Sequence, residues 1–195
     1  MAKALYNTHV ARVSTIPFSM LTQLLPQLEA IKQKGGYVTI VASDDELGDE
    51  LKKLDFCSFK PIYIAREISI FSDIKTFFEL WQLFRIQRFD IVHSITPKAG
   101  LLCAIASRMA GVPIRLHTYT GQPWVTMHGV KKIIVKLCDK LTSILNTQCY
   151  ADSFSQRDFL LKNKIINLKK IKVLGSGSLA GVDLKRFNQN NFTSI

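Results

Sequence analysis

The sequence predicts an α/β protein built on a doubly wound, mostly parallel, Rossmann-like sheet of about seven strands. Three observations lead to this prediction. Short apolar runs alternate along the chain with longer segments in which apolar residues recur every three to four positions. Some runs, such as residues 37–42, are almost continuously apolar, which is typical of strands buried on both faces. Glycine and proline separate many of these segments, as Gly35 and Gly36 do after the first helical pattern.

The expected elements follow one another in a regular alternation. Strands are expected at residues 9–15, 37–42, 61–64, 90–94, 114–118, 149–153 and 171–174. Helices are expected from a cap at Ser19 to residue 34, within the acidic segment 44–54, and at residues 72–87, 99–109 and 129–146. A further helix is expected to start at the Ser-x-x-acid pattern that runs from Ser155 to Asp158.

Three of these helices have a clear apolar face. In the first it comprises Leu21, Leu24, Leu25, Leu28 and Ile31, and Pro26 is expected to kink the helix. In helix 72–87 the inward residues are expected to be Ile74, Phe77, Phe78, Trp81 and Phe84. Helix 129–146 places Val130, Ile134, Leu137, Leu141 and Leu145 on one face and Lys132, Lys136 and Lys140 on another. That pattern suits a packing helix with a solvated face, and it also suits a basic amphipathic helix on an anionic membrane.

Composition limits the class of protein. A chain of 195 residues suits one domain or somewhat more, and a hydrophobic content of 47% excludes a disordered protein. The four cysteines lie far apart without a Cys-x-x-Cys pair, so we expect free thiols in a reducing compartment. No apolar run reaches the roughly 18–20 residues of a membrane span, and the first residues lack the apolar core of a signal peptide. The sequence therefore predicts a soluble or peripheral protein.

The net charge of +11 is distributed unevenly. Residues 1–90 hold 11 Lys and Arg against 11 Asp and Glu, whereas residues 91–195 hold 15 against 4. A half as basic as this favours an anionic partner, such as lipid headgroups, phosphorylated substrates or nucleic acid. A solvated basic surface would give the same count.

The segment after the strand at 114–118 is the strongest candidate for a binding loop. Ligands of parallel α/β proteins lie where strands end at their carboxyl edge. The loop is dense in hydrogen-bonding and stacking side chains: His117, Thr118, Tyr119, Thr120, Gln122 and Trp124. The alternative is an ordinary polar turn.

Other motifs point away from several classes of enzyme. The Gly175-x-Gly177-x-x-Ala180 pattern follows the last strand and leads into a polar tail, so it does not predict a nicotinamide or flavin site. The four histidines lack metal-ligand spacing, and we expect no metal site. Neither a Gly-x-Ser-x-Gly elbow nor a Walker loop occurs.

Three segments together resemble a known family. DIVHSITPKAGLLCAIASRMAGVPIRLHTYTGQPW (90–124), YADSFSQRDFLLK (150–162) and IKVLGSGSLAGVDLKRF (171–187) resemble the N-terminal domain of glycosyltransferase family 4. These GT-B enzymes have two Rossmann-like domains with a cleft between them. The likeness is strongest to bacterial enzymes that build surface polysaccharides and glycans on a polyprenyl carrier.

The resemblance implies transfer of a sugar from a nucleotide-activated donor, usually a UDP-sugar, with retention and without a metal or other cofactor. The N-terminal domain would hold a lipid-linked saccharide acceptor, and a C-terminal domain would hold the donor. Residues 1–187 would form the N-terminal domain, and residues 188–195 would begin a linker or tail. The donor domain is then missing, and whether the same gene product or a partner chain supplies it stays open. We expect the chain alone to be inactive, because transfer needs donor and acceptor together.

The resemblance also suggests site residues. The family often has Thr-x-His where this chain has Thr118-Tyr119-Thr120, so Thr120 and the nearby His117 are the catalytic candidates. The candidates for acceptor binding are Thr96, Lys98, Thr118, Gly121, Gln122, Trp124, Ser153 and Arg157. Lys98 and Arg157 would pair with a diphosphate or remain solvated, and Trp124 would stack on a sugar or fill the core.

Lys132, Lys136 and Lys140 are the candidates for membrane contact, which would place the protein at the cytoplasmic face of the cytoplasmic membrane. Two other classes stay open. A nucleotide-sugar epimerase shares the GT-B architecture and would need no lipid acceptor. A nucleic-acid-binding module would explain the charge, although its usual motifs are missing from the sequence, so we expect no nucleic-acid partner.

Overall fold

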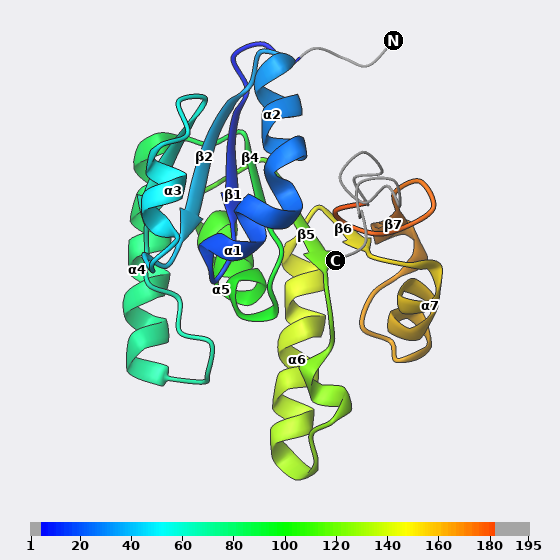
Figure 1. Ribbon diagram of the computed structural model, residues 1–195. Helices are drawn as coiled ribbons and strands as arrows, with labels where there is room; N and C mark the ends of the chain where they lie inside the picture. The colour runs from blue at the N-terminus through cyan, green and yellow to red at the C-terminus, as the bar shows by residue number, and fades with distance from the viewer. Residues whose placement is uncertain (1–4, 182–195) are drawn as a thin grey trace, which may run out of the picture.

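Seven parallel strands form one sheet in the order β3-β2-β1-β4-β5-β6-β7, as the computed structural model of the protein shows (Figure 1). The structure describes residues 5–181. The strands are β1 (His9–Val13), β2 (Tyr37–Ala42), β3 (Cys57–Pro61), β4 (Ile91–Ser94), β5 (Ile114–Tyr119), β6 (Gln148–Ala151) and β7 (Ile171–Val173). Every neighbouring pair is parallel. The predicted doubly wound sheet is confirmed, and its order reverses between β1 and β4.

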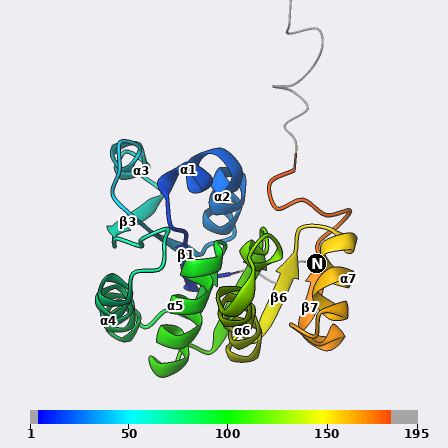
Figure 2. The ribbon, with the colours of Figure 1, turned by 90° about the horizontal axis from the view of Figure 1, so that it is seen from below.

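Helices cover both faces of the sheet (Figure 2). They are α1 (Pro17–Ser19), α2 (Leu25–Gln33), α3 (Gly48–Lys52), α4 (Ile70–Gln87), α5 (Pro97–Met109), α6 (Gly129–Leu145) and α7 (Phe154–Lys162). The first three lie on one side of the sheet and α4 to α6 on the other, where α7 packs beside α6 through a shared apolar cluster. Short 3-10 turns occur at Pro123–Val125 and Leu168–Lys170.

The first helical segment differs from its prediction in its starting residue and in the type of helix that follows. Ser19 is not its cap, because the helix begins at Pro17 and the Ser19 hydroxyl instead bonds with Ser14 Oγ at 2.7 Å and donates to the main chain of Ile16. A π-helical turn, Met20–Leu24, precedes Pro26. A proline has no N–H for the helical ladder, and the wider turn passes this gap before α2 continues regularly.

The third strand lies earlier than residues 61–64. Ile62 and Ile64 are buried in the core under α4 and α5, and their alternation gave the expected strand. Their main-chain N–H groups bond to Ala42 O and to Ser43 Oγ rather than continuing a regular ladder. The alternation therefore reflects burial of a loop, and the strand itself ends at Pro61.

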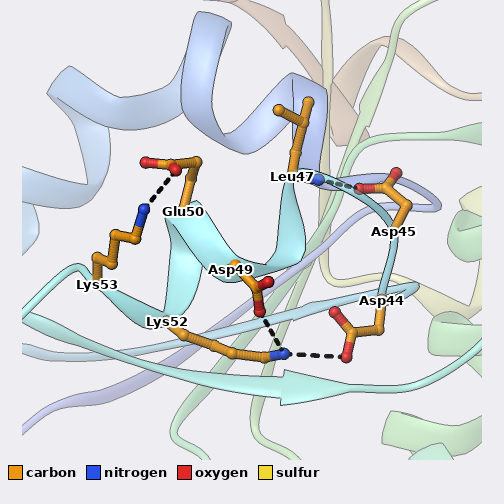
Figure 3. A network of polar contacts seen from close by, with 7 residues as sticks. All are labelled: Asp44, Asp45, Leu47, Asp49, Glu50, Lys52 and Lys53. Carbon is orange, nitrogen blue, oxygen red and sulfur yellow. Dashed lines mark hydrogen bonds and ion pairs between the residues drawn. The ribbon is translucent and has the colours of Figure 1, made fainter.

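The acidic segment contains α3 and a set of ion pairs at the surface (Figure 3). Lys52 Nζ lies 3.2 Å from an Asp44 carboxylate oxygen and 2.9 Å from one of Asp49, and Lys53 pairs with Glu50 at 2.6 Å. All five side chains are largely exposed, so these pairs add little to stability. The segment stays acidic, because Asp45, Glu46 and Asp55 have no part in these ion pairs.

Helix α4 buries a narrower face than predicted. Thr76, Leu80 and Phe84 are buried, with Phe77 and Trp81 packed partly against the same cluster. Ile74 and Phe78 are 51% and 56% exposed, so their assignment to the core is wrong. Phe78 packs edge-on against Phe77 and Trp81 of its own helix.

Helix α6 is turned so that its apolar face points to solvent. Four residues of the apolar face named from the sequence are exposed, with values of 71% for Val130, 52% for Ile134, 58% for Leu137 and 40% for Leu141, whereas Leu145 is half-buried. The buried side of α6 carries polar groups that find partners in the fold: Asp139, Thr142 and Ser143. The Ser143 hydroxyl, for example, donates to the main chain of Ile165 at 2.6 Å. Of the two alternatives drawn from the sequence, packing of this apolar face in the core is therefore not observed for these four residues.

Helix α7 starts two residues earlier than its pattern indicated. Ser153 is the cap, and its hydroxyl accepts from the main-chain N–H of Gln156 at 3.1 Å. Gln156 Oε1 in turn accepts from the N–H of Asp152 at 2.7 Å. The start signal is thus Ser153-x-x-Gln156 rather than Ser155-x-x-Asp158. The proposed domain end at residue 187 and the linker at 188–195 lie outside the described residues.

Candidate active site

The candidate site lies at the carboxyl edge of the sheet, around the ends of β4, β5 and β6. The sheet order reverses between β1 and β4, which is where parallel α/β folds form a crevice. Thr96 joins the loop after β4 to the loop after β1, because its hydroxyl accepts a hydrogen bond from the main-chain N–H of Thr15 at 3.3 Å. Thr96 is half-buried at the start of α5, as expected for a residue at the rim of a cleft.

The loop after β5 keeps three of the predicted residues at the rim. Thr120 is exposed, and its hydroxyl donates to Ile95 O at 3.0 Å, which ties the ends of β4 and β5 together. Gly121 has open space where a side chain would extend. Gln122 is half-buried, and its Nε2 is shielded from solvent without a hydrogen-bond partner among the described residues.

Asp152, at the end of β6, is a site residue that the sequence analysis missed. Its N–H donates to Gln156 and its carbonyl oxygen accepts from the N–H of Ser178 at 2.6 Å. A Cβ at Gly177 would lie 2.7 Å from that carbonyl oxygen, so the close approach requires glycine there. Asp152 Oδ1 nevertheless is buried and has no partner within residues 5–181. Its position beside the predicted Ser153 was the only signal in the sequence.

His117 and Thr118 lie in the interior rather than at the rim. His117 is 1% exposed, and its Nδ1 hydrogen-bonds with the Ser94 hydroxyl at 3.0 Å. Burial lowers the pKa of His117 to about 3, so the imidazole is neutral. Its Cε1 would lie only 2.5 Å from a Cβ at Gly100, which shows how closely α5 packs on β5.

Thr118 faces the opposite side of the sheet and belongs to a buried polar chain. Its hydroxyl lies 2.8 Å from His93 Nε2, and His93 Nδ1 bonds with the guanidinium of Arg12. Burial, with Arg12 nearby, holds the pKa of His93 well below its usual value. The neutral ring therefore accepts from Arg12 and donates to Thr118.

The two predicted diphosphate ligands each have an acidic neighbour. Lys98 is 15% exposed, and its Nζ lies 2.6 Å from Asp73 Oδ1, in an ion pair without the angles of a hydrogen bond. Arg157 pairs with Asp158 at 2.8 Å and stacks on the ring of Phe154. Both cations are therefore partly neutralised before any ligand binds.

Trp124 fills the core, which was one of its two predicted roles. It is 3% exposed, stacks on Phe159 at a centroid distance of 5.5 Å and donates from Nε1 to Asp139. Lys136 lies over the same ring at 5.0 Å. Together with Lys132 and Lys140, Lys136 lines a groove of about 350 Å³ between α6 and the end of α7. A larger hollow of about 540 Å³ lies at the opposite, amino-terminal edge of β4 and β5, away from these residues.

Within residues 5–181, no three His, Cys, Asp or Glu side chains come close enough to hold a metal ion. None of the helices in that range combines the length and the apolar content of a membrane span.

Solved structures share this fold at low sequence identity. A glycosyltransferase from Rickettsia africae matches with a TM-score of 0.68 and 18% identity, over 96% of this chain and 46% of its own. Anabaena Alr3699/HepE, in complex with UDP and glucose, matches with 0.67 and 12%, over 92% and 46%. UDP-GlcNAc 2-epimerase from Methanocaldococcus jannaschii gives 0.61 and 15%, over 87% and 45%. The fold is that of one half of a GT-B enzyme, and more than one enzyme class uses it.

A family model identifies the family of this chain. The model of the family described as glycosyl transferase 4-like matches residues 7–148, well over half of the chain. The chain belongs to this glycosyltransferase family. The resemblance drawn from the three sequence segments is thereby confirmed, and the family membership favours a transferase over a nucleic-acid-binding module.

Two similar proteins are also glycosyltransferases. The capsular polysaccharide biosynthesis glycosyltransferase CapM of Staphylococcus aureus is 34% identical over 165 residues, 85% of this chain and 43% of its own length. The UDP-Gal:alpha-D-GlcNAc-diphosphoundecaprenol alpha-1,3-galactosyltransferase of Escherichia coli is 30% identical over 182 residues, 91% and 43%. This glycosyltransferase chain thus spans less than half the length of either relative.

Proposed function

We propose that this chain is the acceptor-binding, N-terminal domain of a retaining glycosyltransferase. The enzyme would move a sugar from a nucleotide donor, a UDP-sugar, to a polyprenyl-linked saccharide during synthesis of a bacterial surface polysaccharide. The observation that carries the proposal is a pair of unsatisfied groups at the carboxyl edge, Gln122 Nε2 and Asp152 Oδ1. One is a donor and the other an acceptor, and the hydroxyls of a saccharide offer partners to both kinds of group.

The geometry of the rim supports distinct roles for the neighbouring residues. Thr120 is exposed beside Gly121, where there is room for a sugar ring, and it would orient the attacking hydroxyl. Thr96 and Ser153 would line the same crevice. His117 is neutral and enclosed, so its burial favours a positioning role beneath this loop rather than proton transfer.

Charged residues at the rim would receive the acceptor's diphosphate. Lys98 and Arg157 would exchange their contacts with Asp73 and Asp158 for phosphate oxygens. The name of the E. coli relative states a diphosphoundecaprenol-linked acceptor and a UDP-Gal donor. An acceptor and a donor of the same chemical kinds are what we propose here.

Donor binding would fall to a second Rossmann-like domain outside this chain, on the same polypeptide or on a partner. Residues 1–187 would end where the connection to that domain begins. Without it, donor and acceptor are not held together, so the chain alone would not catalyse transfer. No metal or other cofactor is part of the proposal.

Helix α6 would hold the domain on the inner, cytoplasmic face of the membrane. Its outward apolar residues are Val130, Ile133, Ile134, Leu137, Leu141 and Ile144, each 40–71% exposed. Lys132, Lys136 and Lys140 would face the anionic headgroups. The free ends of α4 and α6 extend past the sheet on the same side as the strand ends (Figure 1). Ile70 and Phe71 on α4 are also exposed, so the site would open toward the lipid.

Acceptor binding can be tested on this chain by NMR titration of its main-chain amides. A short-chain prenyl-diphosphate-linked N-acetylhexosamine should shift the amides of Thr120 to Gln122 and of Asp152, whereas a UDP-sugar should not. Asp152→Ala and Gln122→Ala should weaken binding roughly tenfold, because each removes a hydrogen-bonding group. Thr126→Ala, at a nearby exposed threonine, is the matched control and should bind normally. Turnover of a UDP-sugar without acceptor, or shifts only with the UDP-sugar, would instead favour an epimerase-like domain.

A further inference from the structure

The groove between α6 and the end of α7 gathers positive charge without a counter-charge. Its lining contains four lysines, Lys132, Lys136, Lys140 and Lys164, together with Asn163, and no acidic residue. None of these lysines forms an ion pair with another described residue. Lys132, Lys136 and Lys140 follow one another at a spacing of four residues on α6, so their ammonium groups repel one another. An anion placed among them would relieve this repulsion.

One of the four lysines is held in place from two sides. Lys136 Nζ donates to Asn163 Oδ1 at 3.1 Å and lies 5.0 Å above the Trp124 ring. Asn163 is itself fixed, because its Nδ2 donates to Phe159 O at 2.9 Å. Lys136 and Asn163 therefore hold fixed positions in the groove, which unpaired surface lysines would not.

The remaining walls of the groove are alkyl side chains. Ile133, Leu137 and Ile165 line it, and Ile133 and Leu137 also belong to the outward apolar face of α6. Along α6, the row of lysines runs beside the row of alkyl side chains, so a bound molecule meets positive charge and apolar surface side by side. That order of chemistry matches a phospholipid, whose phosphate lies next to its acyl chains.

We propose that this groove binds the phosphate headgroup of an individual anionic bilayer lipid. The phosphate would lie among Lys132, Lys136, Lys140 and Lys164, with an acyl chain along Ile133 and Leu137. This inference rests on the proposed attachment of α6 to the membrane, and it adds a discrete, saturable lipid site to a general attraction of charge. An occupied site would fix the rotation of α6 on the bilayer and so the direction in which the strand ends face.

The proposal is tested first with vesicles of phosphatidylcholine containing phosphatidylglycerol. Lys136→Ala, Lys164→Ala and Lys131→Ala each remove one positive charge, but exposed Lys131 does not line the groove. A discrete site predicts that the two groove variants lose at least fivefold more affinity than Lys131→Ala. Equal losses for all three would overturn the site while leaving attachment of α6 to the membrane intact. Circular dichroism would show that each variant is folded.

The second measurement removes the membrane surface altogether. Dihexanoyl-phosphatidylglycerol, kept below its micelle concentration, should shift the amides of Asn163 to Ile165 in a saturable way. Glycerol phosphate should bind at least tenfold more weakly, because it lacks the acyl chains that contact Leu137. Equal binding of the two compounds would mean a site for free phosphate and would overturn the lipid assignment. Lack of any shift with either compound would also overturn it.

Discussion

The indole Nε1 of Trp124 donates a hydrogen bond to Asp139 Oδ2 at 2.7 Å, and both side chains are buried. The Tyr119 hydroxyl donates to the main-chain oxygen of the same aspartate at 2.9 Å. These two bonds join the end of β5 and the candidate loop to α6. They also turn the polar side of α6 inward, which leaves its apolar side for the membrane that we propose.

Asp139 should make the stability of the protein depend on pH. Burial raises the pKa of its carboxyl from 3.8 to about 6, although the bond from Trp124 opposes the shift. The protonated form is therefore favoured by folding, so this contribution is full below about pH 4 and is lost as the pH rises through about 6. Asp139→Asn keeps an oxygen for the indole and should gain roughly 2 to 3 kcal/mol over the wild type at pH 7.5 relative to pH 4. Urea unfolding at the two pH values measures this. The exposed Asp158→Asn is the control, and an equal effect of Asp139→Asn at both pH values would contradict the prediction.

His117 should make the protein less stable as the pH falls, which is the opposite of the effect of Asp139. Its folded pKa of about 3 lies below the ordinary 6.5, so the unfolded chain takes up a proton that the folded chain refuses. The corresponding stability is present above about pH 6.5 and is lost as the pH falls toward 3, by roughly 2 to 3 kcal/mol at pH 4.5. His117→Gln should flatten the decline of unfolding free energy between pH 6.5 and 4.5, whatever constant loss the substitution adds. The same slope in this variant and in the exposed His128→Gln would be evidence against a neutral, buried His117.

Gly100→Ala should destabilise the protein although alanine favours helices. The new Cβ would lie 2.5 Å from His117 Cε1 and 2.8 Å from its Nδ1, inside the packed contact of α5 with β5. Overpacking should outweigh the gain in helix propensity, with a net loss of roughly 1 to 2 kcal/mol. Thermal unfolding measures the loss, and adding His117→Ala should cancel the clash in a double-mutant cycle. An increase in the melting temperature for Gly100→Ala alone would show that the ring can move aside.

Leu137→Ser and Leu160→Ser should behave very differently although both change a helical leucine. Leu137 is 58% exposed and Leu160 is 0% exposed. We expect a change within about 0.5 kcal/mol for the first and a loss of roughly 2 to 5 kcal/mol for the second, measured by urea unfolding. Leu137→Ser should also lose binding to anionic vesicles. A large loss of stability for Leu137→Ser would mean that its side chain is covered in solution by another copy of the chain.

Much of the fold could be predicted because burial leaves local patterns in a sequence. The apolar run of β2 and the small-residue helix α5 were found within a few residues of their bounds. The rim residues Thr96, Thr120 and Gln122 could be placed because the ends of parallel strands meet at one edge. Where the pattern came from a loop, as at Ile62 and Ile64, the same reasoning put a strand four residues too late.

The sequence by itself determined the order of strands and helices, the basic second half and the family to which the chain belongs. Tertiary structure alone decided which side of α6 faces the core, because that choice depends on Trp124, Phe159 and Ile165, which come from other parts of the chain. It also decided that His117 is enclosed and that Asp152 keeps an unsatisfied oxygen. Periodicity reports the amphipathic character of a segment, whereas partners and exposure depend on what long-range packing brings beside it.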